Sequence, residues 1–312
     1  MAGIRALRKL QYGKETTAGT AVNATAVWRG IGTIQDNLET VFPAEDIGIL
    51  TGTDRSYIPR VEAQLSLDST EATYEQLPVL FNSGIRGVGS TGTWDMAFAS
   101  TDVITSTSLY TYTWEGGDNQ QAEKFAYGFC RSFNLSGDAG GALMMSAEMV
   151  GRQVTTAAYT TGVVVTAVEE ILFSKGVLSI DNTTFPSTTV KSNTLLSINL
   201  AVNTGLTPVY TASGQLYFSF IKMVQPEVIW SITFEHDATS VAEIAAWRAG
   251  TPRSISVKFT GSGNKALTLA AVGKWDNFEK LGERDGNDIV TGNFRARYNA
   301  TAGGMFRAII KK

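Results

Sequence analysis

The chain of 312 residues is long enough for two hydrophobic cores, and 43% of its residues are hydrophobic. Its net charge of −3 argues against electrostatic capture of nucleic acid, its N-terminus lacks the apolar core of a secretory signal, and no stretch reaches the roughly 18–20 apolar residues that cross a membrane. The low charged fraction of 18%, with 31 glycines and much Thr, Ser and Val, favours a mainly β protein. Such a protein is either a free β-sandwich protein or a subunit that hides much of its surface in an assembly.

The two halves of the chain differ in charge. Residues 1–155 hold 11 Lys and Arg against 17 Asp and Glu, whereas residues 156–312 hold 15 against 12. Opposite signs suit a ring in which first halves meet second halves, and ordinary sequence drift explains the difference equally well.

The expected organisation starts with an irregular N-terminal arm over residues 1–27, which are rich in Thr, Ala and Gly. A first domain is predicted over residues 28–155 and a second over residues 156–312. Residues 28–37 are predicted to form a strand, and their counterpart in the second domain is the stretch at 195–202.

A strand followed by a helix occurs twice. Residues 61–86 align without a gap with residues 228–253, so that Leu65 falls on Ile232 and Leu80 on Trp247. Each copy alternates apolar and polar residues, passes through a Ser/Thr/Asp turn, and continues with apolar residues at helical spacing. The pattern indicates a tandem duplication with one flanking helix in each domain.

Two long excursions precede this repeated unit, one at residues 39–60 and one at 204–225. Loops of this length are uncommon in compact domains unless they have a function. We expect hairpin-like arms that leave the domain and become buried on a neighbour. The alternative is an ordinary hairpin that covers the domain's own core.

The remaining stretches return to strands. The glycines and the phenylalanine of residues 128–141 recur at 273–286, an offset of 145 residues instead of the 167 that relates the strand–helix units. The difference indicates an insertion in the first domain, which we expect to be a surface loop at 88–107. The uncharged residues 153–167 connect the halves, and residues 169–181 are predicted to open the second domain as a pair of strands.

The sequence offers little for catalysis. His236 is the only histidine and Cys130 the only cysteine, which excludes an intrachain disulfide, and neither lies in a metal-binding or nucleophile motif. Paired acids such as Glu169-Glu170 more often form solvated faces than glycosidase pairs. We therefore expect no enzyme, no cofactor and no metal.

Several long runs resemble the tail tube protein of long-tailed, non-contractile bacteriophages. In the first half these are WRGIG, FPAEDIGILTGTDRSYIPR, TYEQLP, EGGDNQQAE and LSGDAGGALMMSAEMVGRQV. In the second half they are GQLYFSFIKMVQPEV, FEHDATSVAEIAAWRAGTPR and GKWDNFEKLGERDGNDIVTGNFRARYN, with the stretches at 169–181 and 192–197. The resemblance covers nearly the whole chain beyond the first 25 residues or so.

The resemblance implies two tandem tail-tube-type β-sandwich or half-barrel domains, whose sheets join edge to edge around a lumen in stacked rings. Six domain equivalents would close a ring, so we expect a homotrimer with pseudo-sixfold symmetry, and a hexamer as the second choice. It implies a virion protein assembled in the host cytoplasm, with tape-measure and tail-terminator proteins as partners. Double-stranded DNA would pass through during ejection without specific binding, so the lumen should be neutral or acidic.

The arms are expected to make the inter-ring and inter-subunit contacts. The residues predicted for this role are Phe42, Glu45, Asp46, Ile47, Ile49 and Leu50 in the first arm, and Leu216, Phe218, Phe220 and Ile221 in the second. The competing hypothesis is a two-domain binding module, such as a capsid decoration or adhesin protein, in which the arms stay exposed or pack on their own domain. A hydrolase is a weaker third hypothesis.

Overall fold

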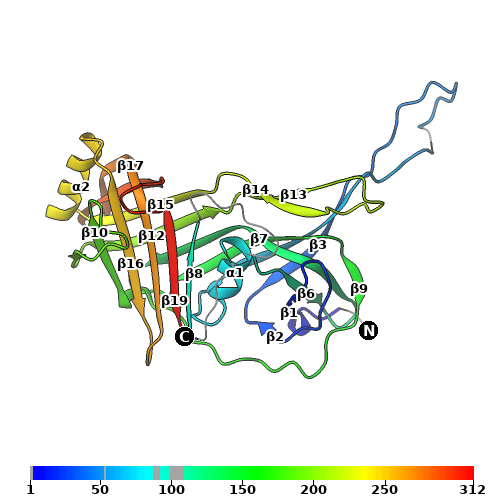
Figure 1. The fold of residues 1–312 in the computed structure, drawn as a ribbon, viewed down its shortest axis with the longest axis horizontal. Helices are drawn as coiled ribbons and strands as arrows, with labels where there is room; N and C mark the ends of the chain where they lie inside the picture. Colours follow the sequence, from blue (N-terminus) through cyan, green and yellow to red (C-terminus); the bar gives the residue numbers. More distant parts are fainter. Residues whose placement is uncertain (1–2, 53, 87–91, 99–108) are drawn as a thin grey trace.

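A computed structural model describes residues 3–52, 54–86, 92–98 and 109–312. The described part of the chain is mainly β with two α-helices, and the first and second halves lie side by side along the long axis of the molecule (Figure 1). No helix in the described ranges is long and apolar enough to span a membrane.

The central feature is a continuous antiparallel sheet of eight strands to which both halves contribute. The first half supplies β3 (Gly32–Leu38), β4 (Val61–Glu71), β8 (Met144–Gly151) and the C-terminal part of β7 (Ala122–Asp138), in that spatial order. The second half continues it with β12 (Leu195–Asn203), β15 (Glu227–Glu235), β18 (Asn287–Ala296) and the C-terminal part of β17 (Ala266–Arg284). The halves join where β7 pairs with β12, from Ser132↔Asn203 to Asp138↔Ser197.

A second layer of strands covers the apolar face of this sheet. In the first half it comprises β1 (Lys9–Lys14), β2 (Ala26–Trp28), β6 (Tyr112–Gly117), β9 (Thr155–Ala157) and the N-terminal part of β7. In the second half it comprises β10 (Gly176–Asp181), β11 (Val190–Lys191), β16 (Arg253–Thr260), β19 (Phe306–Lys311), β5 (Thr93–Ala97) and the N-terminal part of β17. The long strands β7 and β17 therefore cross from one layer to the other.

Both crossing strands carry a β-bulge at matching positions. The register shifts between Cys130 and Ser132 in β7 and between Trp275 and Asn277 in β17, which are 145 residues apart as in the sequence alignment. A bulge bends and twists a strand, which allows it to pass between layers.

Each half has one α-helix directly after its repeated strand. α1 (Leu77–Gly84) is buried along its length, with a proline in its first turn. α2 (Ala238–Arg248) begins at a capping box, in which the Asp237 carboxylate accepts from Ser240 N–H and the Ser240 hydroxyl oxygen accepts from Asp237 N–H. The strand–helix prediction is confirmed in both copies.

The core is built from every second residue of each strand, because side chains alternate between the two faces of a sheet. In β4, Ala63, Leu65 and Leu67 are buried while Gln64 and Ser66 point the other way, and in β15 Trp230, Ile232 and Phe234 are buried. One apolar cluster built from these positions runs through both halves. Separate from it, a smaller cluster lies beneath a hairpin of β13 (Leu206–Val209) and β14 (Phe220–Met223).

The N-terminal arm is not irregular as expected. It contains the 3-10 turn η1 (Arg5–Leu7) and strand β1, which pairs with both β2 and β6. The reason is local, since Leu10 and Tyr12 enter the core of the first half. The single strand predicted over 28–37 is instead divided between β2 and β3.

Two further expectations need correction. The insertion at 88–107 is not wholly a loop, because β5 within it pairs with β19 of the second half, and Arg307 holds Asp95 across the pair with Nε–Oδ1 at 2.7 Å; residues 87–91 and 99–108 of this stretch lie outside the described ranges. Residues 169–181 form η2 (Phe173–Lys175) and the single strand β10 instead of a strand pair.

Candidate functional site

The most extensive feature for function is the open face of the eight-stranded sheet, here called the polar sheet face. It consists of the strand positions that alternate with the core positions, and most of these are polar or acidic, although Ala201, Ile229 and Ile289 on the same side are apolar. Its polar and charged members include Gln35, Asn37, Glu62, Gln64, Ser66, Ser132, Asn134, Ser136, Ser146, Glu148, Asn199, Asn203, Glu227, Ser231, Thr233, Lys274, Asn277, Glu279, Thr291, Asn293 and Arg295.

Side chains on this face bond to one another across neighbouring strands. Asn134 Nδ2 donates to Asn199 Oδ1 at 2.6 Å across the junction of the halves, and Asn293 Nδ2 donates to Asn277 Oδ1 at 2.7 Å. The charge of Arg295 is taken up by Glu227, with Nη1 and Oε1 3.0 Å apart. Because Glu62, Glu148 and Glu279 add negative charge without an equal number of cations, the face is acidic.

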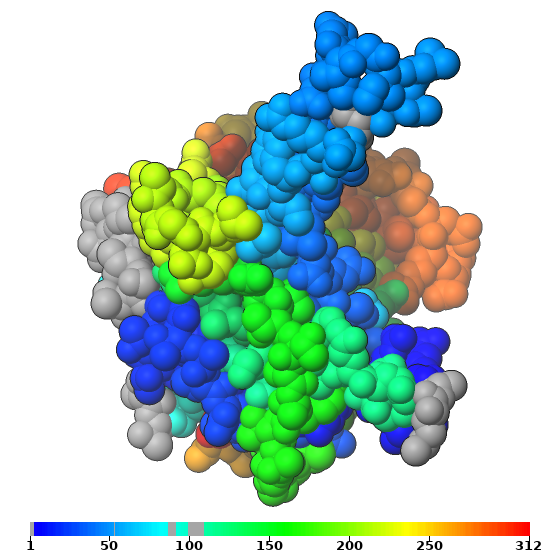
Figure 2. All heavy atoms as spheres, turned by 90° about the vertical axis from the view of Figure 1, so that its right-hand side faces the viewer, coloured from blue at the N-terminus to red at the C-terminus, as the bar shows by residue number. Residues whose placement is uncertain are grey.

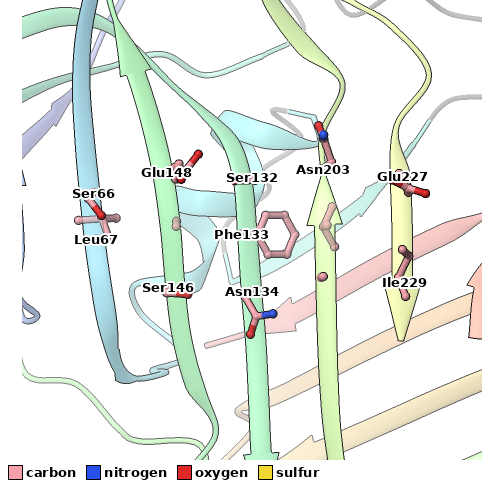
Figure 3. A pocket seen from close by; sticks show the side chains of 13 residues that line it. Ser66, Leu67, Ser132, Phe133, Asn134, Ser146, Glu148, Asn203, Glu227 and Ile229 are labelled. Carbon is pink, nitrogen blue, oxygen red and sulfur yellow. The ribbon is translucent and has the colours of Figure 1, made fainter. Parts of the chain in front are cut away.

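A shallow hollow lies at the centre of the face, where the two halves meet. Figure 3 shows its lining residues on successive strands, from Ser66 through Glu148 and Asn134 to Asn203 and Glu227. The hollow is open to solvent.

The sheet ends in two edges that have no strand partner in the described part of the chain. β3 pairs only with β4, and the C-terminal part of β17 pairs only with β18. Unpaired edges carry rows of free backbone donors and acceptors and are natural sites for pairing with another chain.

The first arm, residues 39–60, projects away from the body of the molecule (Figure 2). It is held as a loose hairpin by the reciprocal backbone bonds of Val41 and Tyr57 (2.9 and 3.1 Å) and by the ion pair between Arg55 and Glu45. Its predicted contact residues are free of the body: Phe42 is 72% exposed, Leu50 is fully exposed, and Ile47 and Ile49 are exposed as well.

The second arm, residues 204–225, lies against the first half of the same chain (Figure 1). Phe218 is fully buried between Tyr127 and Phe129, with ring centroids 5.1 and 5.9 Å away. Arg152 fixes the arm by donating from Nε to Phe218 O at 3.2 Å and from Nη2 to Ser219 O at 2.8 Å.

The predicted contact residues of the second arm therefore divide into two groups. Phe218 and Ile221 are covered by the first half of their own chain, whereas Leu216 and Phe220 are 50% and 41% exposed. Packing on the chain's own body was the alternative considered for both arms, and the structure has this arrangement for the second arm.

The residues weighed for catalysis do not form a site. His236 is exposed at the turn before α2, and its Nδ1 lies 3.4 Å from the Ser240 hydroxyl. Cys130 is fully buried, and burial raises the pKa of its thiol. No group of three or more potential metal ligands occurs among the residues that the structure describes.

Glu169 has a structural role that sequence reasoning missed. Its carboxylate accepts from Ser262 N at 2.7 Å and lies 3.1 Å from Lys265 Nζ, which also reaches Glu75 at 2.7 Å. The Ser262 hydroxyl and amide and then Lys265 lower the pKa of Glu169 to about 2. The three charged groups connect the start of α1 with the β16–β17 turn of the second half.

The polar sheet face was not identified from the sequence, although a signal was present. Glu62, Gln64 and Ser66 alternate with core residues in one strand, as do Ser132, Asn134 and Ser136 in another. A polar residue at such positions usually indicates only a solvated face, and the sequence does not say that these strands are neighbours in one sheet.

Comparison with known proteins gives one finding. A family model described as phage tail tube protein matches residues 6–302, which is nearly the whole chain. No curated protein matches the chain significantly.

Proposed function

Because this chain belongs to the phage tail tube protein family, we propose that three copies form a ring, that the polar sheet face lines its bore, and that the bore conducts double-stranded DNA during ejection. Members of the family are structural proteins, so the chain is a component of the virion tail that self-assembles into a tube, and it is not an enzyme. The observation that carries the proposal is the continuous eight-stranded sheet with one acidic face and two open edges.

Strand geometry supports the proposed number of copies. Three copies contribute eight strands each, which makes a barrel of 24 strands. If the strands lie about 4.8 Å apart and are tilted by about 40°, the backbone of this barrel has a diameter of roughly 50 Å. Six copies would give about 100 Å, far wider than a duplex needs, and the eight strands of one copy close only around their own side chains. Three copies with two similar halves each give pseudo-sixfold symmetry.

The matching strand order of the halves supports a tandem duplication. Both halves place their four sheet strands in the same succession, with the bulged crossing strand at one end. We propose two tail-tube domains, at residues 28–155 and 156–312, with the preceding strand β1 packed onto the first. The junction of β7 with β12 is then repeated between copies, where β17 of one meets β3 of the next.

The chemistry of the face suits rapid transit of DNA. Cationic walls would bind phosphates by releasing counterions, and this attraction would slow the duplex. A face of Ser, Asn and Gln with scattered Glu repels phosphates weakly, and its cations lie at the β17 end, where Arg295 is paired with Glu227 and Asp276 and Lys274 stands opposite it.

Stacking of the rings is assigned to the exposed part of the arms. Phe42, Ile47, Ile49 and Leu50 leave apolar surface uncovered at the tip of the first arm, and burial of each on the next ring is worth about 1.5–3 kcal/mol. Leu216 and Phe220 add exposed apolar surface on the second arm, and Glu45 and Asp46 add charge near the first tip. The proposal also places a tape-measure protein inside the bore and a terminator protein at the end of the tube. Assembly would take place in the host cytoplasm.

Charge reversal within the bore tests this function. Phage carrying Glu148→Lys and Glu227→Lys should assemble tails of normal length but release DNA more slowly, and added salt should restore part of the rate. Thr260→Lys, an exposed position of β16 in the second layer, is the control and should leave ejection unchanged. Equal ejection by the reversed variant and the control would show that the polar sheet face does not meet the DNA.

A further inference from the structure

A groove lies beside the unpaired edge of β3, here called the N-terminal groove. It is formed by η1 and the start of β1 on one side, by residues 30–34 on the other, and by the turn after β6. Ile31 on its wall is 56% exposed, and Ile4 and Leu7 of the same region are about half exposed. This is a large amount of uncovered apolar surface for one end of a sandwich.

The corresponding place in the second half is filled by the first half of the same chain. There the segment before β10 docks against the turn between β7 and β8: Ile171 N–H donates to Ala72 O, and Leu143 N–H donates to Ile171 O at 2.7 Å. Ile171 is fully buried and Phe173 is 4% exposed, with the Phe173 ring directly against Gly137. The interface thus combines pairing of β7 with β12 and insertion of a hairpin tip beside the 3-10 turn.

The sequence positions correspond across the repeat. Ile4 lies 167 residues before Ile171, the same offset that relates the two strand–helix units, and both segments lead into a 3-10 turn and a strand. Ile4 is 48% exposed whereas Ile171 is covered. The first half therefore has the same docking segment without the hairpin tip that covers it.

The missing hairpin is available on a second copy. The β17–β18 tip, residues 281–288, is the counterpart of the β7–β8 turn, and its strand β17 has the second open edge of the sheet. At its base Leu281 is 67% exposed and has a φ of 57°, a left-handed conformation that is unusual for a bulky residue. An apolar side chain held outward at a backbone cost indicates a contact that the isolated chain lacks.

Charge also favours this pairing. The groove carries Arg5, Arg8 and Lys9 against Asp118 and Glu123. The region from 279 to 288 carries Glu279, Glu283, Asp285 and Asp288 against Lys280 and Arg284, and Arg284 is already paired with Asp138 of its own chain at 2.7 Å. A basic groove thus faces a net acidic tip.

We propose that the N-terminal groove of one copy receives the β17–β18 tip of a second copy, with Leu281 as the apolar plug, and that this contact closes the ring. The inference rests on the proposed ring and identifies the residues that join its members. It makes the interface between copies a repetition of the interface within each chain.

Substitution by glycine separates assembly from folding. Leu281→Gly removes the plug and relieves the left-handed backbone, so the subunit should melt at or above the wild-type temperature while the critical concentration for assembly rises roughly 10- to 100-fold. Asn193→Gly is the matched control, since Asn193 is exposed, has a φ of 58° and lies outside both the groove and the tip, and it should change assembly less than about twofold. Wild-type assembly by a folded Leu281→Gly variant would overturn the proposal.

Crosslinking tests the contact directly. The native Cys130 is buried, so cysteines introduced at Ile31→Cys and Leu281→Cys provide the reactive thiols. When the Ile31→Cys, Leu281→Cys variant is assembled into tubes, a short bismaleimide should crosslink its subunits into species of up to three chains. The control variant with Leu281→Cys and Val241→Cys, the latter on α2, should remain uncrosslinked single chains. If three-subunit rings form but residues 31 and 281 do not crosslink, the proposed contact is wrong and the proposed function stands. If no ring forms, both the proposed contact and the proposed function are wrong.

Discussion

Replacement of two phenylalanines distinguishes the two arms. Phe218→Ala in the second arm removes a fully buried ring that contacts Tyr127, Phe129 and Tyr210 at centroid distances of 5.1, 5.9 and 6.4 Å. Truncation of a buried phenylalanine costs about 3–5 kcal/mol. Phe42→Ala in the first arm removes a ring that is 72% exposed, so the stability of the subunit should change by less than about 0.5 kcal/mol.

The cost at Phe218 should appear locally. The second arm is held to the first half by this ring, by the two Arg152 bonds and by the bond from Val61 N–H to Leu216 O, so loss of the ring favours release of the arm before global unfolding. A loss of 3–5 kcal/mol corresponds to roughly a 10²- to 5 × 10³-fold larger population of the released arm. Arg152, Tyr127 and Phe129 would be left without their partner.

Hydrogen exchange measures this population at individual amides. The amide of Val61, which donates to Leu216 O of the arm, should exchange about 10²- to 5 × 10³-fold faster in Phe218→Ala and at the wild-type rate in Phe42→Ala. Assembly should respond to both variants, because Phe42 contacts the next ring in the proposed tube. Unchanged exchange in Phe218→Ala, or local destabilisation by Phe42→Ala, would refute the assignment of one docked and one free arm.

Three further predictions follow from other parts of the molecule. Deletion of residues 45–52 should leave folded subunits that no longer polymerise, as judged by sedimentation and microscopy, and tubes of normal length would exclude a stacking role for the first arm. Glu169→Gln should flatten the fall in melting temperature between about pH 5 and pH 2, because a carboxyl whose folded pKa is lowered to about 2 stabilises the fold above its unfolded pKa and loses this effect as pH falls; identical pH profiles would contradict it. Arg307→Gln should increase hydrogen exchange over residues 93–97, since it breaks the bond to Asp95 that holds β5 on β19, and retained protection would show that backbone pairing suffices.

The sequence was most informative where a pattern repeats. The strand–helix units at 61–86 and 228–253 were predictable because alternation and helical spacing are local, and the 145-residue offset matched the two stretches that contain β7 and β17, although it did not predict their bulges. The positions of the arms were also predictable from length alone. Their different fates were not, because burial of Phe218 depends on Tyr127 and Phe129, about 90 residues away in the chain.

The missed features depend on pairing between distant segments. The strand β1 was read as an irregular arm because Leu10 and Tyr12 form too short a pattern, and its pairing with β2 and with the distant β6 is not visible in the local sequence. β5 joins a strand more than 200 residues later, which no local signal indicates. The polar sheet face emerges only when eight strands are placed in order, since each strand alone has an ordinary solvated face.

The central claim is that one continuous sheet closes into a bore through repetition of its internal junction. Imaging assembled tubes by electron cryomicroscopy, at a resolution that separates strands, tests it most directly. The account predicts three chains per ring, β17 of each chain paired with β3 of the next, and Ser66, Glu148 and Glu227 facing the bore. Six chains per ring, unpaired edges at β3 and β17, or a bore lined by Lys and Arg would contradict it.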